Sequence, residues 1–397
     1  MAKHDYVAAN VRLAIDNGSS HIKGICDELN DAFIFPNVVA QPFGERHLLM
    51  EQGDPLDFLD VQITSHAIDS EQYRHVYVGN LAIGEEGIVH EIVGDKAVQK
   101  KAQRPETIVT LLTAAAYAVA KKHEEDIRRG RKHIKADVDL GTGLPIREIT
   151  KFREPFARRI AGGVHSVTFV TTPVFKGVTV DLAFSLPSDI SIDDVSGVYD
   201  MEATSQSQLA HKGFGIADVG GVDMDIAFFR RGLDLDQRHS TGVKIYLNDA
   251  LESIRNEVNA GGEEFISSTA ELTLMLVNKE YEIYAEGKVA LDMTPLVNRH
   301  MRLLAEKVLK YARNAWKDVR YAKEFWFIGG GAIVLQPWIE KLNAELGLPI
   351  RFDSAEYSQY RNVRGTFFLL EHALKQGADV AAGDANGKGD PGVSETD

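Results

Sequence analysis

Residues 11–23 read VRLAIDNGSSHIK, an apolar run that ends at Asp16 and is followed at once by a polar, glycine-containing stretch. The run predicts a buried strand, and the Asp-Asn-Gly sequence after it predicts a tight turn into a second strand. Residues 215–225, GIADVGGVDMD, repeat this pattern: Asp218 ends an apolar run and glycine follows two positions later. In both stretches a charged residue stands seven positions after the aspartate, Lys23 in the first and Asp225 in the second. The repetition indicates a duplicated protein that holds one ligand from two sides.

The residue types in the two turns suit a nucleotide phosphate chain. Glycine lets the backbone turn sharply and approach an anion, so that successive N–H groups point at phosphate oxygens. Aspartates at the mouths of such turns can hold Mg²⁺ through its retained waters, and Asp16 and Asp218 are the predicted metal-holding residues. The alternative role of each aspartate is to cap its own turn through nearby backbone N–H groups. The predicted phosphate contacts are Asn17, Gly18, Ser19, Ser20, Lys23, Gly220, Gly221 and Val222.

A third glycine turn lies near the end of the chain. Residues 325–332, FWFIGGGA, predict a short apolar strand, a glycine turn and the start of a helix. Three glycines allow the backbone to pack closely under an adenosine, and a helix N-terminus favours phosphate. A plain connection between a strand and a helix is the alternative. The predicted adenosine contacts are Gly329, Gly330, Gly331 and Ala332.

The remainder of the chain alternates strands with helices, which predicts an α/β architecture. The 397 residues carry a net charge of −14 and one cysteine, Cys26. The negative charge argues against direct binding to nucleic acid, and the seven Lys and Arg within residues 121–135 are interpreted as a solvated helix end. No apolar run approaches the roughly 18 residues of a membrane span, and the first residues lack a signal-peptide core. We therefore expect a cytoplasmic protein that binds no membrane.

The three turns resemble those of a known superfamily. Residues 16–19 together with Lys23 resemble the first phosphate loop of actin, and residues 218–221 with Asp225 resemble the second phosphate loop of bacterial actin-like proteins. Residues 327–332 are similar to their adenosine motif. Residues 240–243 (STGV) and 362–365 (NVRG) resemble segments of the ParM/StbA plasmid-segregation family.

The resemblance implies an actin-like (ribonuclease H-like duplicated) two-domain α/β fold with a nucleotide cleft between the domains. Domain I is predicted over residues 1–210 and is completed by a C-terminal helix at residues 350–376, and domain II over residues 211–349. Residues 377–397 contain Gly, Asp, Ser and Pro but no aromatic residue, which predicts a disordered tail.

The resemblance also implies a function: an ATPase that uses ATP with Mg²⁺, GTP being the alternative nucleotide, and assembles head to tail into filaments. It implies plasmid or other DNA segregation through a separate DNA-binding adaptor protein. Glu202 stands where the plasmid proteins carry the residue that positions the attacking water. Gln206 and Gln208 are alternatives, because a neutral amide can also orient water.

Three other functions fit the same superfamily. A small-molecule kinase would need a catalytic aspartate aimed at a substrate hydroxyl, and no substrate motif is evident in the sequence. A chaperone-type ATPase normally adds a substrate-binding domain after the nucleotide-binding domain. A cytoskeletal or organelle-positioning filament would keep the assembly and change the cargo. A fold alone does not decide between these activities.

Overall fold

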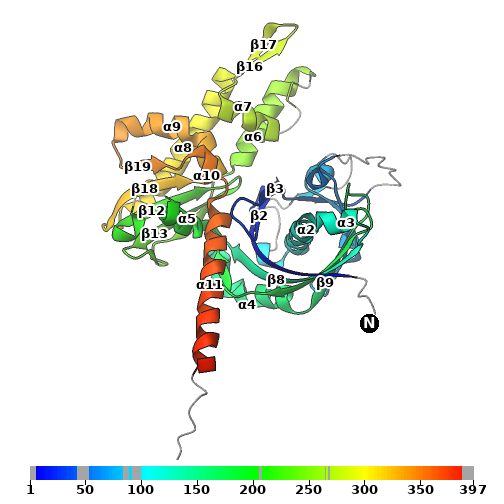
Figure 1. Cartoon of the computed structure of the whole chain (residues 1–397). Helices are drawn as coiled ribbons and strands as arrows, with labels where there is room; N and C mark the ends of the chain where they lie inside the picture. Colours follow the sequence, from blue (N-terminus) through cyan, green and yellow to red (C-terminus); the bar gives the residue numbers. More distant parts are fainter. Residues whose placement is uncertain are drawn as a thin grey trace, which may run out of the picture.

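The computed structural model describes residues 6–42, 53–83, 89–91, 100–204, 208–263, 265–266 and 269–386. In this part of the chain two lobes are built around separate β-sheets (Figure 1). Lobe I comes from the first half of the chain and lobe II from the second half, apart from a C-terminal helix. The predicted α/β architecture with two domains is confirmed.

Lobe I is organised on a long mixed sheet with the strand order β3-β2-β1-β8-β10-β9-β5-β6-β4-β7, and β11 pairs with β8. The central strands β1, β8 and β10 run parallel, whereas β1 and β2 form an antiparallel hairpin. Its strands are β1 (Val7–Asn17), β2 (His21–Cys26), β3 (Ala32–Pro36), β4 (Val38–Ala40), β5 (Leu59–Thr64), β6 (His75–Val78), β7 (Val89–Glu91), β8 (His133–Leu144), β9 (Val164–Phe169), β10 (Thr179–Ser185) and β11 (Ile190–Ile192). Its helical elements are η1 (Pro55–Asp57), η2 (Glu71–Tyr73), α1 (Asn80–Ile83), η3 (Lys101–Gln103), α2 (Pro105–Lys122), α3 (Glu124–Arg128), α4 (Ile146–Ala161) and η4 (Asp193–Val195). The two elements that follow in the chain, α5 (Gly197–Thr204) and η5 (Leu209–His211), pack their apolar side chains on the sheet of lobe II.

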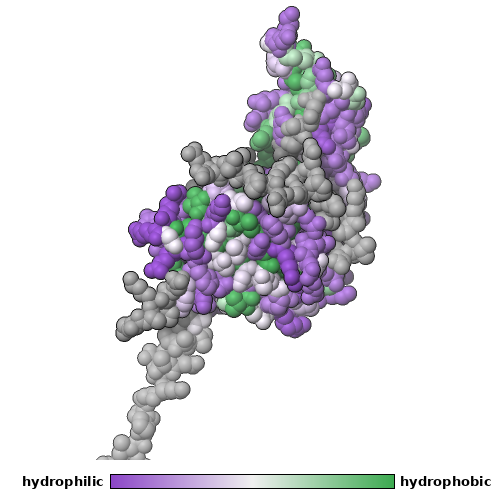
Figure 2. All heavy atoms as spheres, turned by 90° about the vertical axis from the view of Figure 1, so that its right-hand side faces the viewer, coloured by the Kyte–Doolittle hydropathy of each residue, from purple (hydrophilic) through white to green (hydrophobic). Residues whose placement is uncertain are grey.

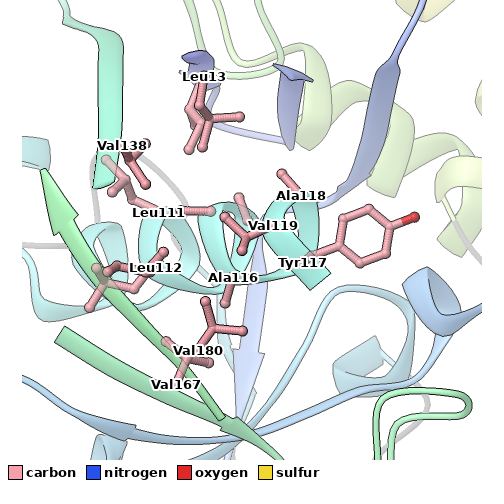
Figure 3. Packing of buried hydrophobic residues seen from close by; sticks show 14 of the residues in the cluster. Leu13, Leu111, Leu112, Ala116, Tyr117, Ala118, Val119, Val138, Val167 and Val180 are labelled. Carbon is pink, nitrogen blue, oxygen red and sulfur yellow. The ribbon is translucent and has the colours of Figure 1, made fainter. Parts of the chain in front are cut away.

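Helix α2 forms the centre of the lobe I core. Pro105 at its first turn has the backbone angle that a helix start requires and no N–H group to leave unpaired. The helix is rich in small and aliphatic residues, and its side chains from Thr107 to Ala120 are buried. Leu111 and Leu112 point toward the sheet residues Leu13, Val138, Val167 and Val180 in Figure 3. A helix with apolar residues on all sides must be buried, and the sheet of lobe I therefore curves around α2.

Lobe II repeats the sheet on a smaller scale, with the order β14-β13-β12-β18-β19 and β15 paired with β13. Strands β12 and β18 are parallel, and β12 and β13 form an antiparallel hairpin. Its strands are β12 (Gly213–Val219), β13 (Asp223–Arg230), β14 (Asp234–Leu235), β15 (Thr241–Lys244), β16 (Glu282–Ala285), β17 (Lys288–Asp292), β18 (Ala322–Ile328) and β19 (Ile350–Phe352). Its helical elements are α6 (Leu247–Val258), η6 (Asn259–Gly261), α7 (Thr269–Asn278), α8 (Thr294–Trp316), α9 (Gly330–Leu346) and α10 (Ala355–Ser358).

Two helix starts in lobe II lie close to the glycine turns. Residues 241–244 pair with β13 as an edge strand, so α6 begins only at Leu247. Helix α9 begins at Gly330, so the second and third glycines of the GGG motif belong to its first turn. Helix α8 buries an apolar stripe that includes Val297, Met301 and Val308.

The C-terminal helix α11 (Arg361–Asn386) returns from lobe II to lobe I (Figure 1). It packs against β1 and β8 of lobe I and against α5, which lies on the sheet of lobe II. At Gly365 the helix approaches α5 so closely that a Cβ atom would clash with the backbone of Ser196 and Gly197. Helix α11 continues through Asn386, beyond the predicted start of the tail at Gly377, and residues 387–397 lie outside the described residues. Among the described helices none combines the length and apolarity needed to cross a membrane.

Candidate functional site: a crevice between two phosphate turns

The seven-residue spacing in the two glycine turns has a direct structural meaning. In the first hairpin Asp16 lies opposite Lys23 on the neighbouring strand, and in the second Asp218 lies opposite Asp225. Each aspartate is the second-last residue of a strand that runs parallel to a neighbour in its sheet, β1 to β8 and β12 to β18. Both turns thus lie at the carboxyl ends of parallel strands, where ligand sites form in open α/β sheets.

The two turns meet across the boundary between the lobes. A Cβ atom placed on Gly221 would lie 2.5 Å from Ser20 Oγ and 2.5 Å from Asn248 Oδ1. Ser20 belongs to lobe I, whereas Gly221 and Asn248, at the start of α6, belong to lobe II. The side chains of Ser20 and Asn248 thus lie directly over the backbone of Gly221, so the two turns approach each other across the lobe boundary.

The third glycine turn packs directly on the second. Gly329 has a positive φ of 87°, a backbone conformation that favours glycine. A Cβ atom on Gly329 would lie 2.1 Å from Asp218 Oδ1, and one on Gly331 would lie 2.7 Å from the Val219 carbonyl oxygen. Gly329 N–H donates to Ser358 Oγ at 2.8 Å. The GGG segment is thus brought to the same crevice.

The first turn carries a nearly buried ion pair. Lys23 Nζ lies 3.0 Å from Asp16 Oδ2, and Asp16 is only 4% exposed. Burial disfavours the charged form of Lys23, but the carboxylates of Asp16, Asp218 and Asp193 outweigh burial and raise its pKa. Lys23 is therefore a firmly charged ammonium at the crevice. The neighbouring His21 is neutral near pH 7, because burial and then the charge of Lys23 lower its pKa to about 4.

The second turn holds a carboxylate with a neutral partner. Asn362 Nδ2, on the first turn of α11, donates to Asp218 Oδ2 at 2.5 Å. Within the described part of the chain no cation lies at ion-pair distance from Asp218. Burial raises the pKa of Asp218 to about 6, despite the opposing effects of Lys23 and Asn362. A bound cation would relieve this cost.

A third carboxylate, Asp193, belongs to the same group of charges and was not predicted. It follows the short strand β11, which pairs with the carboxyl end of β8. Its Oδ2 lies 2.6 Å from Lys101 Nζ, while its buried Oδ1 has no hydrogen-bond partner. Burial raises the pKa of Asp193. The charge of Asp16 also raises this pKa, whereas the charges of Lys101 and Lys23 oppose the increase. The only sequence signal for this site is a pair of aspartates directly after a short strand.

Asn17, a predicted phosphate contact, uses its side chain to fix the first turn. Its Nδ2 donates to the Thr107 carbonyl oxygen at 3.0 Å and to Thr110 Oγ1 at 3.3 Å. Asn37 Nδ2 donates to Asn17 Oδ1 at 2.9 Å and to the Gly18 carbonyl oxygen at 2.7 Å. The side chain of Asn17 therefore ties the turn to the start of α2.

Glu202, the predicted water-positioning residue, lies on α5. Its Oε2 accepts a hydrogen bond from the Ala210 N–H at 3.1 Å, and the largest influences on the pKa of Asp218 do not include it. Gln208 is exposed and has a positive φ of 49° before η5. Gln206 lies outside the described residues.

The described residues contain no group of three His, Cys, Asp or Glu side chains arranged to hold a metal ion. Mg²⁺ is usually bound through one or two carboxylates and its own waters rather than by such a group. Asp218, a buried carboxylate with a neutral partner, has the chemistry for that role.

Two α/β lobes whose glycine turns meet between the lobes define an actin-like protein. Sequence families agree with this class: the N-terminal domain of actin-like proteins matches residues 14–182, and the C-terminal domain of Alp7A matches residues 215–349. The chain belongs to the actin-like proteins, and its C-terminal domain is of the Alp7A type. No curated protein matches the sequence.

Solved structures of the same fold span the whole of lobes I and II. Bacillus thuringiensis ParM with ATP is 19% identical, with a TM-score of 0.68, and the alignment covers 92% of this chain and 99% of that one. The actin-like protein Alp7A is also 19% identical, with a TM-score of 0.68 and coverage of 94% and 100%. A subunit of a 15-stranded ParM filament from Clostridium botulinum is 17% identical, with a TM-score of 0.63 and coverage of 92% and 99%.

Proposed function

We propose that this protein binds ATP with Mg²⁺ in the crevice, hydrolyses it, and uses the cycle to control its own assembly into filaments. The observation that carries the proposal is the contact of Ser20 with Gly221 across the lobes, next to Asp218 and Gly329. One ligand held by both turns would bridge the two lobes, so its phosphate state would set their relative position. The nucleotides in related structures support this proposal: ParM has been solved with ATP, ADP and AMPPNP.

The roles of the turns follow from their chemistry. Backbone N–H groups of Gly18, Ser19, Ser20 and residues 220–222 would donate to phosphate oxygens, and Lys23 would add a positive charge. Residues 329–332 would pack under the adenosine. Asp16 and Asp218 would hold the water shell of Mg²⁺, which when bound neutralises charge on the phosphates.

Two carboxylates are candidates for orienting the attacking water. Glu202 is the candidate from sequence, and it is engaged by the Ala210 N–H. Asp193 has a buried oxygen without a partner, and its charge interacts with those of Lys23 and Asp218. We favour Asp193, since an unpaired buried acceptor in such a site is costly unless a ligand or water completes it.

Paired substitutions separate the two candidates. Asp193→Asn is expected to lower the single-turnover rate of ATP hydrolysis by about a hundredfold with nucleotide binding retained, whereas Glu202→Gln is expected to hydrolyse ATP at close to the wild-type rate. A large loss in Glu202→Gln together with normal turnover in Asp193→Asn would return the role to Glu202.

Filament assembly is supported by the relatives and by the surface. Head-to-tail contacts that do not close into a ring generate helical filaments. Exposed apolar side chains gather on the projecting end of lobe II, where Figure 2 shows hydrophobic residues, and include Leu274 on α7, Tyr284 on β16 and Val289 on β17. Exposed apolar clusters of this kind mark interaction sites. The proposed cargo is plasmid or other DNA, recruited through a separate DNA-binding adaptor.

Electron microscopy and light scattering test the assembly. Filaments are expected with Mg·ATP, and fewer or shorter filaments with Mg·ADP or without nucleotide. Protein that stays soluble at high concentration while phosphorylating a small molecule would instead identify a kinase of the same superfamily.

A further inference from the structure

We propose that Lys101 is a positioning residue for ATP hydrolysis: it holds Asp193 by one carboxylate oxygen and leaves the other free to orient the attacking water. The inference rests on the proposed function, because it assigns a role within the same crevice. Lys101 lies on η3, far in sequence from the three glycine turns, and no motif points to it.

The ion pair leaves Asp193 one oxygen with which to act. Lys101 Nζ lies 2.6 Å from Asp193 Oδ2, and the two side chains are 14% and 2% exposed. The backbone of Asp193 is fixed as well, since a Cβ atom on Gly143 would lie 2.8 Å from both its N and Cα atoms. With one oxygen held and the backbone packed, Oδ1 has little freedom to turn away.

Lys101 is itself held by α4. Glu148 accepts the backbone N–H of Lys101 at 3.2 Å and that of Ala102 at 3.1 Å, one with each carboxylate oxygen. Arg159 Nη1 donates to the Ala102 carbonyl oxygen at 2.8 Å. Side chains of α4 thus hold the short helix η3 at two backbone donors and one backbone acceptor. Such a second layer of support is what holds a reactive group in place.

The same segment also reaches the first phosphate turn. Helix α2 begins two residues after η3 ends, and its Thr107 carbonyl oxygen accepts the hydrogen bond from Asn17. Residues 101–107 therefore connect Asp193 to the turn that would bind the phosphates. A shift of η3 would change the distance between the water-orienting carboxylate and the phosphate chain.

The alternative is that the pair only stabilises the fold. A buried ion pair is weak evidence for stabilisation, because the cost of desolvating both charges offsets their attraction. The two roles differ in what they change: a positioning residue affects hydrolysis more than nucleotide binding, and a residue of the same charge should restore its effect.

The experiment compares Lys101→Met and Lys101→Arg in the full chain, with Lys212→Met as the matched control. Lys212 makes a similar ion pair in lobe II, 2.8 Å from the 9% exposed Glu324. Single-turnover ATP hydrolysis, nucleotide affinity and thermal unfolding are measured for each variant. Lys101→Met is expected to hydrolyse ATP at least tenfold more slowly, with nucleotide affinity within about twofold of wild type. Lys101→Arg is expected to recover most of the rate, and Lys212→Met to keep it.

The outcomes are distinct. Unchanged hydrolysis in Lys101→Met, equal losses of rate and affinity, or no recovery with arginine would overturn the inference while leaving the proposed function intact. A wild-type protein that hydrolyses no ATP would overturn the proposed function itself, and the inference with it.

A double variant covers the case in which Lys101→Met does not fold. Lys101→Met/Asp193→Asn removes both charges of the pair, and it is expected to hydrolyse ATP as slowly as Asp193→Asn alone, because groups that act as one unit are not additive. A further loss in the double variant would contradict the inference.

Discussion

The two phosphate hairpins share their geometry and differ in their charges. In lobe I the residue opposite the aspartate is Lys23, and the two form an ion pair. In lobe II the residue opposite the aspartate is another aspartate, Asp225, and Asp218 is held by the neutral amide of Asn362. The duplicated fold therefore presents one neutralised carboxylate and one without a cation at the same crevice.

The difference assigns separate tasks to two aspartates that look equivalent in sequence. Asp16 keeps its ion pair without a ligand, so it contributes to the stability of the lobe. Asp218 bears the cost of a buried charge without a cation, which a Mg²⁺ ion with its waters would offset. Stability and function are thus expected to respond in opposite ways to the loss of each carboxylate.

The largest expected effect is on hydrolysis by Asp218→Asn. Without its carboxylate the crevice loses its strongest attraction for Mg²⁺, and metal-ion stabilisation of a phosphoryl transition state is worth several kcal/mol. We expect the rate of ATP hydrolysis to fall about a thousandfold, equivalent to roughly 4 kcal/mol. Phosphate release at saturating Mg·ATP measures it.

The control is Asp223→Asn in the same hairpin. Asp223 is partly exposed and lies 3.8 Å from Lys244, on the strand next to the hairpin. It is expected to change hydrolysis little. Similar losses in both variants would show that Asp218 is not distinguished from its neighbours.

The next effect is on stability: the free energy of unfolding is expected to fall in the variant of the first hairpin and to rise in the variant of the second. Asp16→Asn leaves the ammonium of Lys23 buried without its ion-pair partner, and breaking one side of a buried pair costs about 3 kcal/mol. Asp218→Asn removes a buried charge without a cation and is expected to stabilise the nucleotide-free protein at pH 7.5. Urea unfolding without nucleotide or Mg²⁺ measures both.

The double variant Asp16→Asn/Lys23→Met is expected to recover most of the stability lost in Asp16→Asn, since no unpaired charge remains. If Asp16→Asn and Asp218→Asn lose stability to the same extent, the contrast between the hairpins is wrong.

How much of this contrast could be predicted from the sequence depends on how far apart the interacting residues lie along the chain. The strand-turn-strand pattern around Asp16 and Asp218 is a local property, so it predicted both hairpins, although not their registers. That the two turns come together was predicted from the recurrence of the pattern and its resemblance to actin, whereas the contact of Ser20 with Gly221 was not. These features rest on short stretches whose backbone conformation their own residues determine.

The partners of these residues could not be predicted, because they come from distant segments. Asn362 reaches Asp218 from the C-terminal helix, and Asn37, between β3 and β4, fixes the first turn. Asp193 depends on the pairing of β11 with β8, which no local pattern encodes. For Asn17, the sequence predicted its place in the turn but not the hydrogen bonds of its side chain to α2.

A smaller effect concerns pH: the difference in the free energy of unfolding between wild type and Asp218→Asn is expected to depend on it. The pKa of Asp218 is about 6 in the folded protein and 3.8 without burial. A raised carboxyl pKa means that the folded state binds the proton more tightly, so the penalty is complete above pH 6 and disappears below about pH 4. The stability advantage of Asp218→Asn should therefore shrink by about 2 kcal/mol between pH 7.5 and pH 4.5.

Measurements in the absence of nucleotide and Mg²⁺ check this dependence. Taking the difference between the two proteins removes the titration of all other groups that they share. An advantage that stays constant over this range would show that Asp218 does not titrate near pH 6.

The smallest effect expected is that of Gly221→Ala, which tests whether the hairpins must approach each other to bind the ligand. The added methyl group would meet Ser20 Oγ and Asn248 Oδ1 at 2.5 Å, so these two side chains must turn away or the two turns must separate. Nucleotide affinity is expected to fall about tenfold, or roughly 1.4 kcal/mol, as measured by titration with ATP. Gly261→Ala is the matched control, because an added Cβ there meets no atom within 4 Å. Equal affinities in the two variants would mean that the close contact of the turns is not needed for binding. The residues of a single lobe would then have to bind the phosphates.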